Sequence, residues 1–329
     1  MLLDNQRYIY LDWNVIKYMK NPRQNKIELD SQFAKTVFAL KRKYKFPYSN
    51  AHIKDISNHY SDAYKDKVED DISFAQKIND NHCICINNNN EIFVMKYDMK
   101  THFWKHISEQ QSVLPPQIKN TIDYSFNVNM AELSENHPMF DFLKKHNGLI
   151  SPNDMDTFFD ELYNEIFQNN ETYKRFRDFI PKINISTDFN QAYSNAETLA
   201  LDSLLYHIGP FISSFKYDED TLKKEWLDIS RRFFTLRTDN PTQAFLLTNS
   251  YMLLDMHPLF KEKLKKNKNT LDNIVRDGNH CYFASNSKYY VSEDEHTRNK
   301  TSFLYKVFNI KTKVKSESEF LKQFPDILI

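Results

Sequence analysis

Two aspartates near opposite ends of the chain have the residue type and the position to do metal chemistry. Asp12 follows the run over residues 7–11 and Asp294 follows the run over residues 288–291, and both runs are rich in aromatic and β-branched residues. If these runs are neighbouring strands of a parallel sheet, both carboxylates lie just past the carboxyl ends of strands, where open α/β sheets place their sites. Carboxylates gathered at one place suggest a bound metal ion.

A third aspartate, Asp55, lies on a helix that is expected to begin after the N-cap residue Ser49. A short strand is expected over residues 45–48, so Asp55 also falls close to the end of a strand. Taken alone, an aspartate within a helix is more often a solvated polar residue. Asp62 is near enough in sequence to compete for the same role.

A fourth aspartate, Asp277, is three residues before His280, and residues at this spacing share one face of a helix. The pair could orient an acid in a site, or it could be an ordinary surface pair. His280 could also pack as a neutral imidazole beside its aromatic neighbours. Asp272 could take the place of Asp277.

The acids at helix starts have ordinary explanations as well. Asp12 alone would favour a helix dipole by less than ~1 kcal/mol. Ser292 and Glu295 are expected to form a capping box, which would place Asp294 in the first turn of the following helix. What favours a functional interpretation is that all the acids occur together, each near the end of an expected strand.

Alternating strands and helices at both ends of the chain must position these residues. A helix over residues 13–19 follows the first strand, and near the other end a strand over 311–314 precedes a helix over 317–324. Such β-α alternation indicates a parallel sheet flanked by helices. We therefore expect an α/β fold in which residues 1–60 and 268–329 form one domain.

The middle of the chain, residues 61–267, is expected to be a mainly helical insertion into that domain. It begins with a β-hairpin near residues 82–98, where four asparagines can adopt positive φ in the turn. Apolar stripes at helical spacing predict the remaining elements of the insertion. These expected helices cover residues 151–166, 194–212, 222–236 and 241–256.

Composition excludes several classes of function. Only three glycines occur in 329 residues, and they are too few and too far apart for a P-loop, a dinucleotide-binding turn or a nucleophile elbow. Three cysteines without a C-x-x-C spacing favour neither a disulfide framework nor a zinc site. The 44 basic and 44 acidic residues balance, so net charge gives no argument for nucleic acid.

The sequence also favours a cytoplasmic location. No apolar run approaches the ~18 residues that a membrane span needs, and the amino terminus is interpreted as a strand rather than a signal segment. We therefore expect no membrane partner. The large insertion could instead contact a second copy of the chain or another protein.

Four short passages carry a resemblance to a known family: Leu11-Asp12-Trp13-Asn14, the helix start from Ser49 to Asp55, Asp277-x-x-His280, and Val291-Ser292-x-Asp294 with Lys300 downstream. In type and order they resemble the PIN domain, a metal-dependent nuclease fold of toxin and RNA-processing proteins. The resemblance covers residues 5–60 and 268–316 and leaves the middle unmatched.

The resemblance implies roles for the four aspartates. Asp12, Asp55, Asp277 and Asp294 would bind Mg²⁺ or Mn²⁺ and activate a water for attack on a phosphodiester. Chemistry agrees, because carboxylates from separate elements can hold one or two such ions, and two ions can assist both the attacking and the leaving oxygen. Asp55 is the weakest match, since the family often has Glu at its position.

Other residues would assist the acids. Asn14 resembles the polar residue that braces the cluster, and His280 and Ser292 are expected to support it. Lys300, on the helix after Asp294, would contact the backbone of the nucleic acid, although a solvated lysine is the ordinary expectation.

The sequence thus predicts a divalent-metal-dependent nuclease with an α/β PIN-like fold. By family resemblance alone we expect RNA rather than DNA as its substrate, which would make it an endoribonuclease. The alternative is a catalytically inactive PIN-like module that binds RNA or protein through its insertion. An inactive relative usually loses metal ligands, whereas every candidate position here is acidic.

Overall fold

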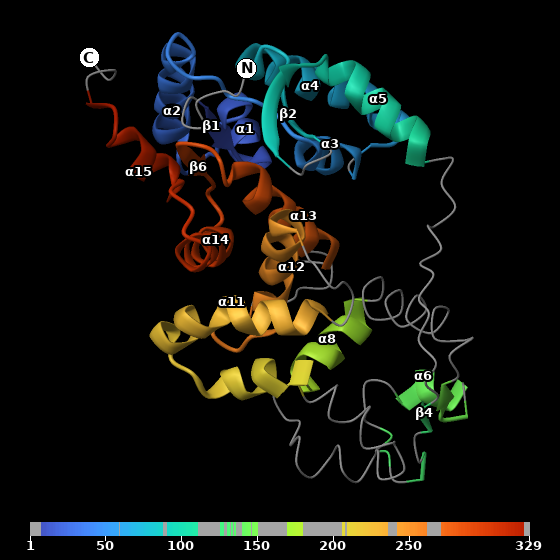
Figure 1. Cartoon of the computed structure of the whole chain (residues 1–329). Coiled ribbons are helices and arrows are strands. Elements are labelled where there is room, and N and C mark those ends of the chain that lie inside the picture. Colours follow the sequence, from blue (N-terminus) through green and yellow to red (C-terminus); the bar gives the residue numbers. More distant parts are fainter. Residues whose placement is uncertain are drawn as a thin grey trace. The chain divides into compact units, whose positions relative to one another are not determined.

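The computed structural model describes most of the terminal parts of the chain and shorter stretches of its middle. The described residues are 8–58, 60–87, 91–110, 126–127, 130–131, 133, 135, 140–145, 147–150, 170–179, 206–207, 209–235, 242–261 and 271–325. They form an α/β protein with a parallel three-stranded sheet flanked by helices (Figure 1). The expected α/β class is confirmed at this level.

The chain divides into two compact units. The first unit comprises residues 1–113, 242–251 and 276–329, and the second comprises residues 114–241 and 252–275. The first unit therefore continues beyond residue 60, where the insertion was expected to begin. The reason is that the β-hairpin and the helices on either side of it share the hydrophobic core of the first unit.

The parallel sheet of the first unit joins the two ends of the chain. Its strands are β1 (Ile9–Leu11), β6 (Tyr289–Val291) and β7 (Lys313–Lys315), in the order β1-β6-β7. Leu11 pairs with Val291 at the carboxyl ends of β1 and β6. The expected pairing of these remote strands is therefore confirmed, and the last strand begins two residues later than expected.

Parallel bridges continue this sheet beyond β1. Tyr8 bridges to Lys45, and Tyr48 bridges to Cys83 in β2 (His82–Ile86). The strand expected over residues 45–48 is thus present as two bridges. Since the chain leaves β1 for this side and returns as β6 on the other, the strand order reverses between β1 and β6. Open α/β sheets bind ligands in the crevice at such a point.

The expected hairpin is also present, because β2 pairs with β3 (Ile92–Lys96) in antiparallel fashion. The helices of the first unit are α1 (Trp13–Lys20), α2 (Ile27–Leu40), α3 (Asn50–Ser57), η1 (Asp62–Tyr64), α4 (Lys65–Asn79), α5 (Met99–Gln110), α14 (Glu295–Val307) and α15 (Glu317–Leu321). Of these, α1, α3, α14 and α15 lie close to helices that were expected from the sequence. Two further helices, α12 (Gln243–Met256) and α13 (Leu271–Ala284), contribute residues to both units.

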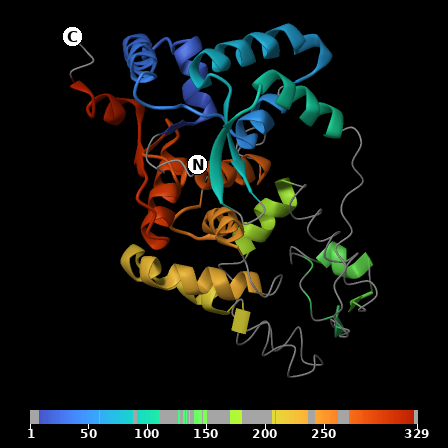
Figure 2. The same cartoon turned by 45° about the horizontal axis from the view of Figure 1, so that its top comes forward.

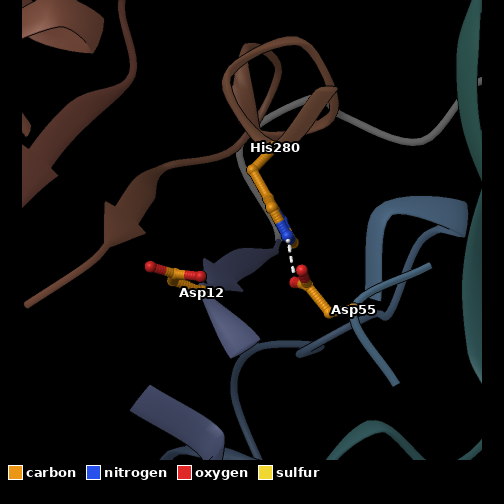
Figure 3. Close-up of side chains that lie close together, drawn as sticks. All are labelled: Asp12, Asp55 and His280. Carbon is orange, nitrogen blue, oxygen red and sulfur yellow. Dashed lines mark hydrogen bonds and ion pairs between the residues drawn. The ribbon is translucent and has the colours of Figure 1, made fainter. Parts of the chain in front are cut away.

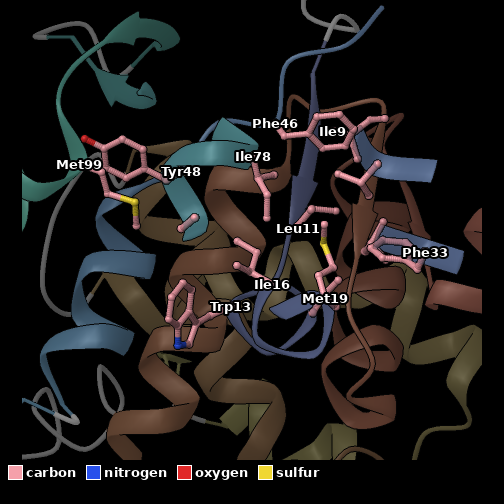
Figure 4. Close-up of a cluster of buried hydrophobic side chains, with 14 of the residues drawn as sticks. Ile9, Leu11, Trp13, Ile16, Met19, Phe33, Phe46, Tyr48, Ile78 and Met99 are labelled. Carbon is pink, nitrogen blue, oxygen red and sulfur yellow. The ribbon is translucent and has the colours of Figure 1, made fainter. Parts of the chain in front are cut away.

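Helices cover both faces of the sheet (Figures 1 and 2). Because side chains alternate along a strand, Ile9 and Leu11 point to one face and join a core formed with α1, α2, α4 and α15 (Figure 4). Tyr10 points to the opposite face, where its hydroxyl meets His280 of α13. The alternation continues past the strand, so Asp12 follows Tyr10 onto the α13 side.

A glycine permits close packing of α13 on α12. A Cβ built on Gly278 would lie 3.0 Å from the carbonyl oxygen of Thr248 and 3.4 Å from Cβ of Tyr251. The first of these distances is too short for a methyl group without a shift of one helix. The residue beside Asp277 is therefore small for a packing reason.

The described part of the second unit is mainly helical. It contains α6 (Phe140–Lys145), α8 (Asn170–Phe179), η4 (Ser214–Lys216), α11 (Glu219–Thr235) and the short pair β4 (Phe126–Asn127) and β5 (Leu149–Ile150). The expected helix over 222–236 is confirmed as α11, whereas those over 151–166 and 194–212 lie wholly or largely outside the described residues.

Buried polar groups help to hold the second unit together. Asp255 accepts hydrogen bonds from Tyr173 and from Arg177, at 2.8 Å each. All three side chains are almost fully buried. Within the described part of the chain, no helix combines the length and the apolar character needed to cross a membrane.

Candidate metal centre

Asp12 lies at the carboxyl end of β1, at the switch point of the sheet. It is the N-cap residue of α1, but its carboxylate makes no capping hydrogen bond, so it does not serve the helix start in that way. Its backbone N–H donates to the carbonyl of Val291 at 2.9 Å, and Oδ2 accepts a 2.8 Å hydrogen bond from the hydroxyl of Ser292. Both the backbone and the carboxylate of Asp12 are therefore bonded to the segment that contains β6. Asp12 is 5% exposed.

Asp55 approaches from α3, which begins as expected at the N-cap Ser49. Its Oδ2 lies 2.7 Å from Nε2 of His280, and its Oδ1 lies 3.0 Å from Nε of Arg276. Figure 3 shows His280 directed from α13 toward Asp55, with Asp12 beside them at the end of β1. Asp55 therefore has a cationic or hydrogen-bonding partner on each oxygen.

Three side chains converge closely enough to share one ion. Asp12, Asp55 and His280 each offer a ligand atom, and these atoms all lie within 4.8 Å of one another. They come from three separate elements, β1, α3 and α13. Two of the four predicted aspartates are thus brought together, with the histidine that the sequence had ranked only as a supporting residue.

Asp277 and Asp294 are neighbours of this group without belonging to it. Among the residues that the structure describes, neither belongs to a set of three or more ligand atoms that lie within 4.8 Å of one another. The Thr297 hydroxyl donates to Asp277 at 3.4 Å, and the Thr297 N–H donates to Asp294 at 2.8 Å. One residue of α14 thus links the two outer acids.

Asp294 corrects one sequence expectation. It is itself the N-cap of α14, whereas the capping box was expected to start at Ser292. The hydroxyl of Ser292 donates to Asp12 and accepts from the N–H of Asp294 at 3.3 Å. Ser292 therefore contacts the acidic group without being the N-cap of the helix.

Burial and mutual repulsion perturb the acids. Burial, with added repulsion from Asp55 and Asp294, raises the pKa of Asp12 above its ordinary value although His280 opposes the rise. Burial also raises the pKa of Asp277 well above its ordinary value, and the charge of Asp12 adds to this. The aspartates therefore repel one another within one small volume, and a cation bound among them would relieve this repulsion.

The pair formed by Asp55 and His280 behaves differently. Burial alone would raise the pKa of Asp55, but the charges of His280 and Arg276 outweigh it and lower that pKa. Burial would lower the pKa of His280, but Asp55 and then Asp12 and Asp277 outweigh it and raise that pKa. The two side chains therefore stabilise each other in their charged forms.

A buried hydrogen-bond chain that the sequence did not reveal lies behind His280. The hydroxyl of Tyr10 is 2.7 Å from Nδ1 of His280 and 2.6 Å from Oγ of Ser49. The N–H of Ser49 donates to Nδ1 of His52, and Nε2 of His52 donates to the carbonyl of Leu11. These partners require the neutral form of His52 with its proton on Nε2.

Burial and His280 lower the pKa of His52 to about 3, which agrees with that neutral form. His280 is consequently fixed on both nitrogens, by Asp55 and by Tyr10. One signal could have revealed part of this arrangement. Tyr10 lies two positions before Asp12, on the same face of a strand.

Two predicted roles do not fit the structure. Lys300 is 1% exposed and its Nζ lies 5.3 Å from the centre of the Tyr251 ring, so it is a buried residue rather than one that meets a substrate. Asn14 is exposed on α1, and its side chain makes no hydrogen bond with the described residues. Residues two apart on a helix do not face each other, which is why Asn14 does not brace Asp12.

The competing acids are not part of the group. Asp62 is exposed in η1 and accepts a 3.0 Å hydrogen bond from Tyr60. Asp272 is exposed in the first turn of α13. Arg276 was missed in the sequence, although it lies four residues before His280 and therefore on the same helix face.

Comparisons with protein-family models, with curated proteins and with solved structures found no match to this chain.

Proposed function

We propose that this protein is a divalent-metal-dependent nuclease whose centre is built on Asp12 and Asp55. The observation that carries the proposal is the convergence of Asp12, Asp55 and His280, with ligand atoms within 4.8 Å of one another, at the switch point of a parallel sheet. Ligand sites of open α/β sheets lie at this point. The pKa values of Asp12 and Asp277 are raised by burial and by neighbouring acids. A bound cation would stabilise both carboxylates in their charged forms.

The donor atoms fit a divalent ion. Carboxylate oxygens suit Mg²⁺ and Mn²⁺, whereas an imidazole nitrogen suits first-row transition metals. If His280 joins the ligands, Mn²⁺ fits the set better than Mg²⁺. If His280 instead keeps its hydrogen bond to Asp55, the ion would be held by Asp12 and Asp55. Asp277 and Asp294 would then bind the ion directly after a small shift, or indirectly through a bound water.

Each residue has a role in this proposal. A bound ion would lower the pKa of a coordinated water and offset the negative charge that develops on a phosphodiester. Asp12 and Asp55 would hold the ion, Ser292 would orient Asp12, and His280 would orient Asp55. Asp277 and Asp294 would add negative charge beside the ion. Such supporting hydrogen bonds usually tune metal affinity and activity.

Nucleic acid is the proposed substrate, with RNA preferred over DNA. Support comes from the resemblance of the terminal segments to PIN-domain nucleases and from the strand order, which brings those segments together as that resemblance requires. On this view the α/β unit is PIN-like. A metal ion would also let a polyanion approach an otherwise acidic site.

One observation favours a second candidate, an inactive PIN-like module that binds RNA or protein. Arg276 and His280 already neutralise Asp55 from both oxygens. An acid held in this way can be a structural ion pair rather than a metal ligand. The two candidates differ in whether the protein binds a divalent ion through Asp12.

The test is to incubate the protein with single-stranded RNA and with single-stranded DNA in Mn²⁺, in Mg²⁺ and in chelator. We expect cleavage of RNA with metal and no cleavage with chelator. Asp12→Asn should abolish cleavage, because the amide removes a charged ligand. Asp62→Asn and Asp272→Asn are matched controls, since both replace exposed acids outside the group, and both should cleave normally.

The outcomes separate the candidates. If the parent protein and the Asp12→Asn variant cleave RNA equally, and if cleavage persists in chelator, then another site or a contaminating nuclease is responsible. Complete inactivity, with RNA binding that is unchanged by Asp12→Asn, would support the binding module.

A further inference from the structure

Arg276 is bonded to Asp55 but has no role in the proposed reaction. Its Nε lies 3.0 Å from Oδ1 of Asp55, and the two side chains are 13% and 17% exposed. The His280 side chain, on the other oxygen, is only 1% exposed. Arg276 is therefore the partner of Asp55 that lies nearer to solvent.

Arg276 and a divalent ion would compete for the same carboxylate. The guanidinium lies 3.0 Å from Oδ1 of Asp55 and so stabilises the negative charge that a metal ion would otherwise stabilise. A cation bound to Oδ1 of Asp55 would lie beside the guanidinium, and like charges at this separation repel strongly in a partly buried site. Binding of the ion thus weakens the hold of Asp55 on Arg276.

A guanidinium that loses its bond to Asp55 can bond to a phosphate group instead. Its planar fork of N–H donors matches the oxygens of a phosphate, and Arg is the residue that proteins use most often for such bidentate contacts. The partly exposed position of Arg276 at the edge of the acidic group allows a phosphate of the chain being cleaved to reach it.

We propose that Arg276 is a substrate-binding residue that exchanges Asp55 for a phosphate of the nucleic acid when a divalent ion binds. This inference rests on the proposed function. It implies that metal and nucleic acid strengthen each other's binding, because each one draws Arg276 and Asp55 apart. It also assigns to Arg276 the contact with substrate that the buried Lys300 does not provide.

The test measures Mn²⁺ affinity by electron paramagnetic resonance for the parent protein, Arg276→Gln, Arg276→Lys and Asp12→Asn. We expect Arg276→Gln to bind Mn²⁺ about fivefold more tightly or better, because the competing charge is gone. Arg276→Lys keeps the charge and should stay near the parent value. A general loss of packing would instead affect both Arg276 variants alike, and circular dichroism would reveal it.

The second arm repeats the titration with a single-stranded RNA analogue in which methylene groups replace the bridging 3′ oxygens, so that the phosphates keep their free oxygens but the chain is not cleaved at that bond. Mn²⁺ affinity of the parent protein should rise by about fivefold or more when RNA is present, as coupling between sites typically does. Arg276→Gln should show no such rise. An equal rise in both proteins would overturn the exchange of Arg276 onto phosphate.

The outcomes distinguish this inference from the proposed function. Loss of Mn²⁺ binding in Asp12→Asn, with unchanged or weaker binding in Arg276→Gln, would overturn the role of Arg276 and leave the metal centre standing. Parent-like Mn²⁺ binding in Asp12→Asn would instead overturn the metal centre, and the inference with it.

Discussion

The hydroxyl of Ser292 donates a 2.8 Å hydrogen bond to Oδ2 of Asp12, across 280 positions of sequence. Both side chains are buried, and they extend the pairing of β6 with β1 by one further contact. The bond therefore has two consequences, since it fixes the direction of the Asp12 carboxylate and joins the two terminal segments of the chain.

Replacing Ser292 with Ala should test the second of these consequences, the joining of the two terminal segments. The change leaves a buried carboxylate short of one donor, so we expect a loss of about 1–3 kcal/mol in the free energy of unfolding, measured by denaturant titration. The control is Ser73→Ala, because Ser73 is exposed on α4 and bonds only to a carbonyl within its own helix. It should change stability by less than about 0.5 kcal/mol.

Replacing Asp55 with Asn should lower the pKa of His280. Asp55 is the main cause that raises this pKa against the effect of burial, and an amide removes the charge. Proton NMR of the imidazole ring during a pH titration measures the change. His257 is the internal control, because burial lowers its pKa and the carbonyl of Ser214 is its hydrogen-bond partner. An unchanged His280 titration would contradict the charge coupling described above.

Glu317 should make the stability of the protein depend on pH. Burial, with repulsion from Glu293, raises the pKa of Glu317 from 4.5 to about 8, although its Oε2 lies 2.5 Å from the guanidinium of Arg23. A raised pKa means that the folded state binds the proton more tightly. The stabilisation is therefore complete below pH 4.5 and is lost as the pH rises toward about 8.

In the Glu317→Gln variant the side chain at position 317 is uncharged at every pH. The free energy of unfolding of this variant should therefore lose the pH dependence that Glu317 causes, which can reach about 1.4 kcal/mol per pH unit. Urea titrations between pH 5 and pH 8 measure the slope. Glu319→Gln is the control, because the N–H of Ser316 lowers the pKa of Glu319. Its contribution is lost only as the pH falls, outside this range, so that variant should keep the parent slope.

Replacing Gly278 with Ala should destabilise the contact between α12 and α13. The added methyl would lie 3.0 Å from the carbonyl oxygen of Thr248, so one helix must give way slightly, and we expect overpacking of about 1–3 kcal/mol to outweigh the gain of about 0.5–1 kcal/mol that Ala brings within a helix. Gly209→Ala is the matched control, since a Cβ there meets nothing within 4 Å. It should be neutral or stabilising by about 0.5–1 kcal/mol. Thermal unfolding of both variants gives the comparison, and equal melting temperatures would contradict the close approach.

Local patterns were sufficient for most elements that carry the site. The alternation around Tyr10 predicted β1, the Ser49 N-cap predicted the start of α3, and the run before Ser292 predicted β6. Each of these signals lies within a few residues, because strand alternation and helix capping are properties of short segments. The expectation that β1 and β6 pair was correct because β-α units at both ends required a common sheet.

Other features could not be obtained from local patterns. The hairpin joined the first unit through a bridge from Tyr48 to Cys83, a contact that depends on how α4 and α5 pack. Lys300 was predicted to contact the substrate, with a solvated lysine as the ordinary expectation, yet the fold buries it against Tyr251. The sequence placed the start of a capping box at Ser292, whereas in the structure Asp294 caps α14 and accepts from the N–H of Thr297.

The sequence by itself determined the types and order of the acidic residues, the α/β class and the two terminal segments that share a sheet, because these follow from spacing along the chain. Only the tertiary structure decided which acids meet. It placed Asp12 and Asp55 with His280, left Asp277 and Asp294 at the edge, and set Arg276 against Asp55. The physical reason is that distances among side chains from β1, α3 and α13 depend on how these elements pack, and packing is cooperative over the whole unit.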